Sequence, residues 1–153
     1  MFNKTNSILL VAMAFATLAS SSFARGVTVI QGSGSAQAIN AYQFAGNGSV
    51  RVGDLQTSES SLATLLSLAP GPGGKLVGTS THTIVLGAAG SITTSDELML
   101  VPVNPYGLFE MSIRSQIIGG TGDFAGASGR LSFNGFANLA TGEVVWQVHG
   151  QIE

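Results

Sequence analysis

The stretch Ser115–Leu131, "SQIIGGTGDFAGASGRL", poses the first question about the fold of this 153-residue chain. Its centre, Gly120–Ala125, follows an apolar run and fits G-x-G-x-x-[G/A], the glycine pattern of dinucleotide-binding loops. In such a loop the glycines let the backbone approach a pyrophosphate, which the N-terminus of the following helix binds. The residues after the glycines therefore decide between a phosphate site and a purely architectural turn.

Those residues predict a strand. The segment 127–139, "ASGRLSFNGFANL", alternates apolar with polar residues and contains two more glycines, a poor composition for a helix. No lysine follows the glycines, so a Walker A loop is excluded as well. We interpret the stretch as a glycine-rich corner between two strands, where glycine tolerates positive φ and close backbone contacts. Phe124 is then expected to plug one end of the core.

Outward from this corner, the chain consists of short apolar segments separated by turn signals. After Lys75 the predicted strands are 76–86, 91–103, 108–118, 130–139 and 143–152. One or two further strands are expected within 27–52. The segment 60–69 fits one face of a helix and the alternation of a strand almost equally, and both remain open. The spacing favours an all-β meander, sandwich or barrel.

The turn residues also predict how two strands pair. Asn104–Gly107, "NPYG", has the residue preferences of a type I turn, with Gly107 suited to a bulged hairpin loop. That loop sets Val101 opposite Met111 and Met99 opposite Ile113, which would place these apolar side chains on one face.

Two other hairpins are predicted in the same way. Gly87–Ser91, "GAAGS", favours a longer loop that sets His82 directly opposite Asp96. Around Ala140–Gly142 an even-length loop separates the two faces best. One face is then apolar and contains Leu131, Phe133, Ala137, Leu139, Val144, Trp146, Val148 and Ile152.

Composition excludes several classes of function. The chain has no cysteine, which excludes disulfides, cysteine zinc sites and thiol catalysis. Only 9% of residues are charged and no Lys/Arg cluster occurs, so no nucleic-acid partner is expected. Neither a G-x-S-x-G elbow nor H-x-x-x-H spacing is present, and we predict no cofactor and no metal site.

The N-terminus has the pattern of a secretory signal. Lys4 precedes the apolar run Ile8–Ala19, and Ser22 and Ala24 supply the small residues of a cleavage site. A run of 12 residues is too short to span a bilayer, so no membrane span is expected after cleavage. The expected organisation is a signal peptide at 1–24 and a single domain at 25–153, in a secreted or periplasmic protein.

Two blocks resemble a known superfamily. The segment 117–152, "IIGGTGDFAGASGRLSFNGFANLATGEVVWQVHGQI", resembles the G-G-T-G-x-F-x-x-A-x-G signature of the allene oxide cyclase and dirigent barrel superfamily, especially its small secreted bacterial members. The segment 78–103 is similar to the superfamily's G-x-x-x-H strand and following T-x-D strand. The resemblance implies a closed, calycin-like antiparallel barrel of about eight strands with a lumen open at one end. It also implies a trimer, and a small hydrophobic or phenolic ligand.

His82 and Asp96 form the best candidate for chemistry. In the predicted registers Arg114 and Gln116 lie near this pair, and an imidazole held by a carboxylate beside a cation is a usable acid–base arrangement. The catalytic candidates are His82, Asp96 and Arg114, and the candidate ligand-binding residues are Leu98, Leu100, Gln116 and Trp146. An ordinary pair on the outer face is the simpler interpretation, and the facing of the even-numbered residues 82–98 decides between the two.

Three functions follow from these predictions. The leading one is an exported barrel that binds a small apolar or phenolic molecule in its lumen. The second is a cofactor-free isomerase or cyclase that uses His82 and Asp96 as acid and base, with Arg114 stabilising charge. The third is a structural or assembly protein with a filled barrel, whose apolar exterior forms a homo-oligomer.

Overall fold

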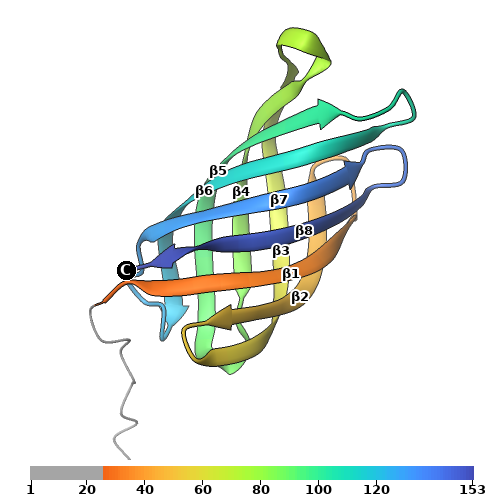
Figure 1. Cartoon of the computed structure of the whole chain (residues 1–153). Helices are drawn as coiled ribbons and strands as arrows, with labels where there is room; N and C mark the ends of the chain where they lie inside the picture. The colour runs from red at the N-terminus through yellow and green to blue at the C-terminus, as the bar shows by residue number, and fades with distance from the viewer. Residues whose placement is uncertain (1–25) are drawn as a thin grey trace, which may run out of the picture.

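A computed structural model describes residues 26–153, which form a closed barrel of eight antiparallel strands (Figure 1). The strands are β1 (Thr28–Ala38), β2 (Gln43–Val52), β3 (Leu55–Pro70), β4 (Leu76–Val85), β5 (Gly90–Pro102), β6 (Leu108–Gly122), β7 (Gly129–Asn138) and β8 (Glu143–Ile152). Each strand pairs with the next, and β8 pairs with β1 to close the sheet. The predicted all-β, eight-stranded barrel is confirmed.

Two short 3-10 turns interrupt the meander, η1 (Pro72–Gly74) between β3 and β4 and η2 (Gly87–Ala89) between β4 and β5. Across residues 26–153 we find no helix that is both long and apolar enough to cross a membrane. The predicted signal peptide at 1–24 lies outside the described residues.

The segment left open between helix and strand belongs to β3. The pairing of β3 with β4 shifts register between Leu65 and Ser67, which marks a β-bulge. Because the extra residue changes the phase of the alternation, Leu65 and Leu68 both reach the lumen, while Leu66 is 63% exposed. Apolar residues at a spacing of three are therefore compatible with a strand here.

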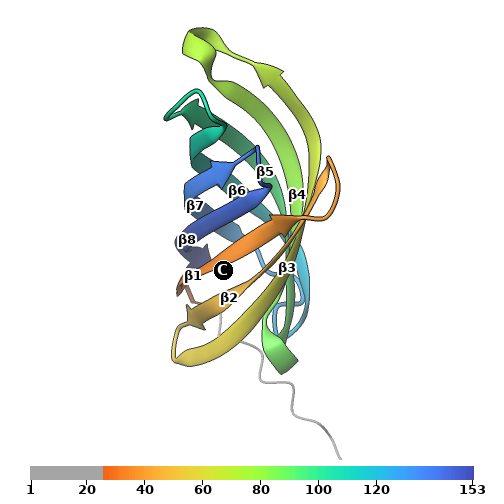
Figure 2. The same cartoon turned by 90° about the vertical axis from the view of Figure 1, so that its right-hand side faces the viewer.

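The interior divides into two halves. Around one end the inward residues pack into a closed core that contains Ile30, Val50, Val52, Ile84, Leu86, Ile92, Ile117, Phe124, Leu131, Val148 and Ile152. We call this the closed half, and we call the other end, where the lumen is hollow, the open half. Figure 2 shows β3 and β4 curving along one side of the barrel, with β6, β7, β8 and β1 on the other.

The glycine-rich stretch forms a corner at the closed end, as predicted. Strand β6 ends at Gly122 and β7 begins at Gly129. Gly122 and Gly126 have φ values of 60° and 76°, which only glycine adopts without strain. Phe124 is 2% exposed and belongs to the hydrophobic core. The corner therefore closes the barrel with an aromatic side chain, and no helix follows it.

The predicted register of the β5–β6 hairpin is wrong by one residue. The carboxamide oxygen of Asn104 accepts hydrogen bonds from the backbone N–H groups of Tyr106 and Leu108, and Val103 N–H donates to Leu108 C=O. This arrangement leaves a four-residue loop, 104–107. The pairs are therefore Leu100–Met111 and Leu98–Ile113.

A shift of one residue exchanges the two faces of a strand. Leu98 and Leu100 consequently point into the barrel, whereas Met99 and Val101 lie on its outer face.

The predicted register of the β4–β5 hairpin is wrong by two residues. Leu86 N–H donates to Gly90 C=O, so the loop contains only the three residues of η2. The observed pairs are Ile84–Ile92, His82–Thr94 and Ser80–Asp96. Because a shift of two preserves the facing of every side chain, His82 and Asp96 still share one face, as diagonal neighbours.

That face is the inside of the barrel. His82 lines the lumen and Asp96 is buried beneath it, so the simpler interpretation of an outer-face pair is wrong. The predicted even-length loop of the β7–β8 hairpin is confirmed, with Phe133 opposite Val148 and Ala137 opposite Val144.

Candidate functional site

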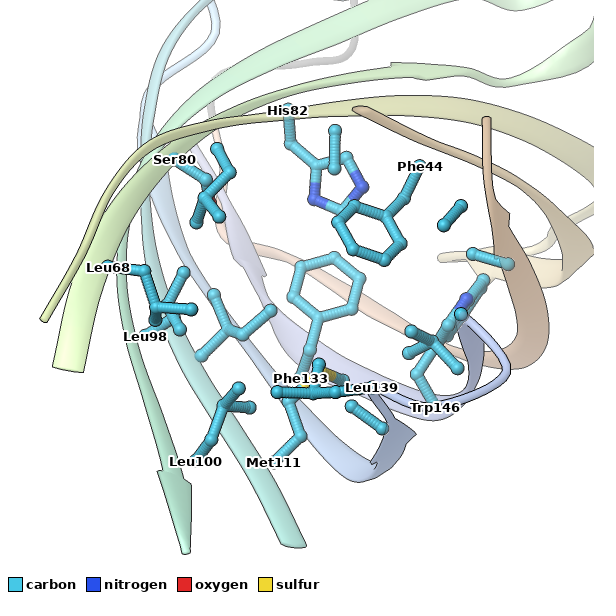
Figure 3. Close-up of a pocket in the computed structure, with 18 of the residues that line it drawn as sticks. Phe44, Leu68, Ser80, His82, Leu98, Leu100, Met111, Phe133, Leu139 and Trp146 are labelled. Atoms are coloured by element: carbon cyan, nitrogen blue, oxygen red, sulfur yellow. The ribbon is translucent and has the colours of Figure 1, made fainter. Parts of the chain in front are cut away.

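The open half of the barrel contains a cavity of about 330 Å³. Figure 3 shows His82, Phe44 and Phe133 projecting into its middle, with Trp146 at one side and Leu68, Leu98 and Leu100 at the other. Most of its lining is apolar and includes Phe44, Ala63, Leu65, Leu98, Leu100, Met111, Ile113, Phe133, Ala137, Val144 and Trp146. Its size and apolar character match those of small-molecule sites in proteins.

The cavity exists because several inward positions carry small side chains. Ala36 and Ala38 on β1, Ala63 on β3 and Ala137 on β7 all line it. The inward residues of the same strands in the closed half are larger, as at Ile30 on β1. Alanines at these positions leave empty the volume that branched side chains fill at the closed end.

Three rings make contact at the base of the cavity. The Phe133 ring lies with its centroid 5.3 Å from that of His82 and 5.7 Å from that of Trp146, and the latter pair is edge-to-face. The Trp146 indole covers the inner faces of Gly34 and Gly48, where a Cβ atom would collide with the ring. Glycine at these positions is what allows the indole to approach the barrel wall this closely.

A group of polar side chains, which we call the polar belt, separates the cavity from the closed half along β4, β5 and β6. It consists of Ser80, His82, Thr94, Asp96 and Ser115. Further toward the closed end, the same three strands carry Ile84, Ile92 and Ile117. Toward the open end they carry Leu98, Leu100, Met111 and Ile113.

Asp96 is the centre of the polar belt. Its side chain is fully buried, and its carboxyl oxygens accept hydrogen bonds from Ser80 Oγ at 2.9 Å and Thr94 Oγ1 at 2.6 Å. Ser115 pairs with Asp96 across β5 and β6, but its buried hydroxyl has no hydrogen-bond partner. Two hydroxyl donors thus hold this carboxyl group without a cation.

His82 connects the polar belt to the cavity. Its Nδ1 lies 3.9 Å from Asp96 Oδ2, too far for a hydrogen bond, and is buried without a partner. Burial lowers the pKa of the imidazole below its ordinary value, and the Asp96 carboxyl opposes this shift. We therefore expect a neutral imidazole at neutral pH. With Nδ1 on the Asp96 side, Nε2 is the nitrogen left for a molecule in the cavity.

A second buried carboxyl group lies inside the barrel. Glu59 on β3 is 4% exposed, and neither of its carboxyl oxygens has a hydrogen-bond partner. It pairs with Gly48 on β2, one of the glycines that the Trp146 ring covers. Burial raises the pKa of the Glu59 carboxyl above its ordinary value.

Four of the seven predicted site residues line the cavity: His82, Leu98, Leu100 and Trp146. Asp96 lies directly behind His82 in the polar belt. The structure does not bring Arg114 and Gln116 to this site. The one-residue correction of the β5–β6 register pairs Arg114 with Glu97 and Gln116 with Ser95, and places both exposed side chains on the outer face.

Ser80, Thr94, Ser115 and Glu59 are not among the residues predicted from the sequence. Ser80 and Thr94 alternate with His82 and Asp96, so strand periodicity was sufficient to place them on the same face. Ser115 faces Asp96 only in the observed β5–β6 register, which differs from the predicted one by one residue. Glu59 can be placed inside the barrel only once β3 is known to be a strand, because alternate residues of that strand, Glu59, Ser61 and Ala63, then face inward.

No family model, no curated protein sequence and no solved structure matches this chain. Within residues 26–153, no three His, Asp or Glu side chains lie together as a set of metal ligands. The chemistry of the cavity must therefore be interpreted from its own side chains.

Proposed function

We propose that this protein binds a small, largely apolar or phenolic molecule in the open half of its barrel. The observation that carries the proposal is the 330 Å³ cavity, which is lined by aliphatic and aromatic side chains and has one imidazole at its base. Hollow apolar sites with a few polar groups are typical of small-molecule binding. A structural protein has no comparable need for such a void, because empty volume in a core reduces stability.

A fluorescent probe tests this proposal directly. N-phenyl-1-naphthylamine is uncharged and emits strongly only in apolar surroundings. We expect saturable enhancement of its emission by the protein, together with a change in the emission of Trp146, the only tryptophan of the chain.

Two variants on neighbouring positions of β3 localise the binding. Ala63→Phe adds a ring at a position that lines the cavity, and Leu62→Phe places the same ring on the exposed outer face. We expect Ala63→Phe to weaken probe binding by about 10-fold or more and Leu62→Phe to leave it unchanged. Equal affinity in both variants, or no binding to the wild-type protein, contradicts the proposal.

Turnover is the second candidate, and the observation that favours it is the proximity of His82 and Asp96. A neutral imidazole beside a carboxyl group is a possible general base. Nevertheless, the 3.9 Å separation leaves the pair without a hydrogen bond, and Arg114, the predicted charge-stabilising group, lies on the outer face. These two features favour binding over catalysis.

We also propose export of the protein and kinship with the allene oxide cyclase and dirigent barrels. Export is supported by the apolar run Ile8–Ala19 with the small residues that follow it. Kinship is supported by the glycine-rich signature within 117–152, and the eight-stranded barrel is the fold that this signature implies.

A further inference from the structure

Charge is distributed unequally between the inside and the outside of the barrel. Two carboxyl groups, those of Glu59 and Asp96, are buried inside. The cations within residues 26–153 are Arg51, Lys75, Arg114 and Arg130, and none of them lines the cavity. Three of them are exposed and Lys75 is half-buried beside η1. A molecule in the cavity therefore meets a neutral imidazole but no positive side chain, and the two buried carboxyl groups lie behind the lining.

This distribution opposes the entry of an anion. Moving a carboxylate from water into an apolar site is strongly unfavourable unless a cation or several hydrogen-bond donors receive it. The lining offers no Lys or Arg among the described residues. The Ser80 hydroxyl and the Asn40 carboxamide already donate to Asp96 and Gln43, so few donors remain to receive a carboxylate. A neutral molecule of the same size avoids this penalty.

The polar atoms at the base of the cavity indicate what such a neutral molecule should carry. A neutral imidazole has one N–H and one acceptor nitrogen. Both Asp96 oxygens accept hydrogen bonds, and Oδ2 lies 3.9 Å from Nδ1, so this side favours the tautomer with the proton on Nδ1 and leaves Nε2 as an acceptor toward the cavity. A ligand with an O–H or N–H group can therefore donate to His82, whereas an ether of similar shape cannot.

We propose that the cavity selects uncharged molecules with one hydrogen-bond donor, aligned on His82, and excludes carboxylates. The inference rests on the proposed binding function and specifies the chemical class of the ligand. It distinguishes this lumen from binding sites for fatty acids or other organic anions, where a cation or several donors would be needed to receive the carboxylate.

The charge selection is tested by displacement of N-phenyl-1-naphthylamine from the wild-type protein at pH 7.5. 4-Propylbenzamide and 4-propylbenzoate have nearly the same shape, but only the benzoate is charged. We expect the benzamide to displace the probe with an inhibition constant about 10-fold or more below that of the benzoate. Equal or tighter binding of the benzoate overturns the proposal.

The donor requirement is tested by a second pair, 4-propylphenol and 4-propylanisole. We expect the phenol to bind about 5-fold tighter, because the anisole leaves the His82 acceptor unpaired. In His82→Leu the two affinities should become equal, whereas His149→Leu, on the exposed outer face of β8, should retain the difference. Equal affinities in the wild-type protein, or a preference that survives in His82→Leu, overturn the role of His82.

The outcomes separate this inference from the proposed function. If the probe itself does not bind, the proposed function fails. If the probe binds but the benzoate competes as well as the benzamide, only the ligand class is wrong. Both ligand comparisons use the wild-type protein, so the inference stays testable even if His82→Leu does not fold.

Discussion

The closed and open halves of the barrel share the same strands but differ in what their inward side chains fill. In the closed half, branched side chains such as Ile30, Val50 and Val52 pack together and Phe124 covers the end. In the open half, Ala36, Ala63 and their neighbours leave a cavity of about 330 Å³. An eight-stranded barrel has an interior that side chains can fill or that can hold one small ligand. Side-chain volume at inward positions therefore decides which half is hollow.

The boundary between the halves is also chemical. The polar belt lies where the aliphatic core ends and the cavity begins, so His82 can reach the cavity while Asp96 behind it stays buried. Glu59 differs from Asp96, because its carboxyl group is buried inside the barrel without a hydrogen-bond partner. Three substitutions test whether the two halves have the separate roles that we assign to them.

The largest effect is expected at the closed end. Phe124→Ala removes a ring that is 2% exposed, and should lower the free energy of unfolding by about 3–5 kcal/mol in urea denaturation. The matched control is Phe136→Ala on the exposed outer face of β7, for which about 1 kcal/mol or less is expected. If the two variants lose the same stability, Phe124 does not close the core.

An intermediate effect is expected for Glu59→Gln. Because the pKa of Glu59 is raised in the folded protein, the unfolded chain loses this proton at a lower pH. The stability of the wild-type protein should therefore fall as the pH rises from about 4.5 through the folded pKa. The variant lacks this fall and should be more stable by about 1 kcal/mol at pH 7.5, with no gain below pH 4.

Urea denaturation at several pH values measures this difference. Glu110→Gln, on the exposed outer face of β6, is the control and should leave the pH dependence unchanged. If wild-type protein and Glu59→Gln show the same pH dependence, the buried carboxyl group does not titrate as we infer.

The smallest effect is expected for Arg114→Ala. The side chain is exposed on the outer face of β6, opposite Glu97, so its loss should change the free energy of unfolding by no more than about 0.5 kcal/mol. Binding of N-phenyl-1-naphthylamine should be unchanged. A clear loss of probe binding would mean that Arg114 contributes to the lumen after all.

The sequence predicted the class of fold because its signals are local. The alternation along 130–139 and 143–152 excluded the helix that a dinucleotide loop needs, and the glycines of 119–129 required a corner. The predicted and the observed β4–β5 registers differ by two residues, so both place His82 and Asp96 on one face. These inferences depend only on the period of a strand and on the backbone freedom of glycine.

Tertiary structure decided the strand registers, in which a shift of one residue changes which side chains face the lumen. The Asn104 carboxamide oxygen accepts hydrogen bonds from the backbone N–H groups of Tyr106 and Leu108, and the β5–β6 loop is four residues long. The resulting register brings Leu98 and Leu100 inside and leaves Arg114 outside. The bulge at Leu66 likewise brings Leu65 and Leu68 into the cavity. The sequence determined which residues alternate, but loop length and bulges set their phase, and only the closed barrel shows which phase faces the lumen.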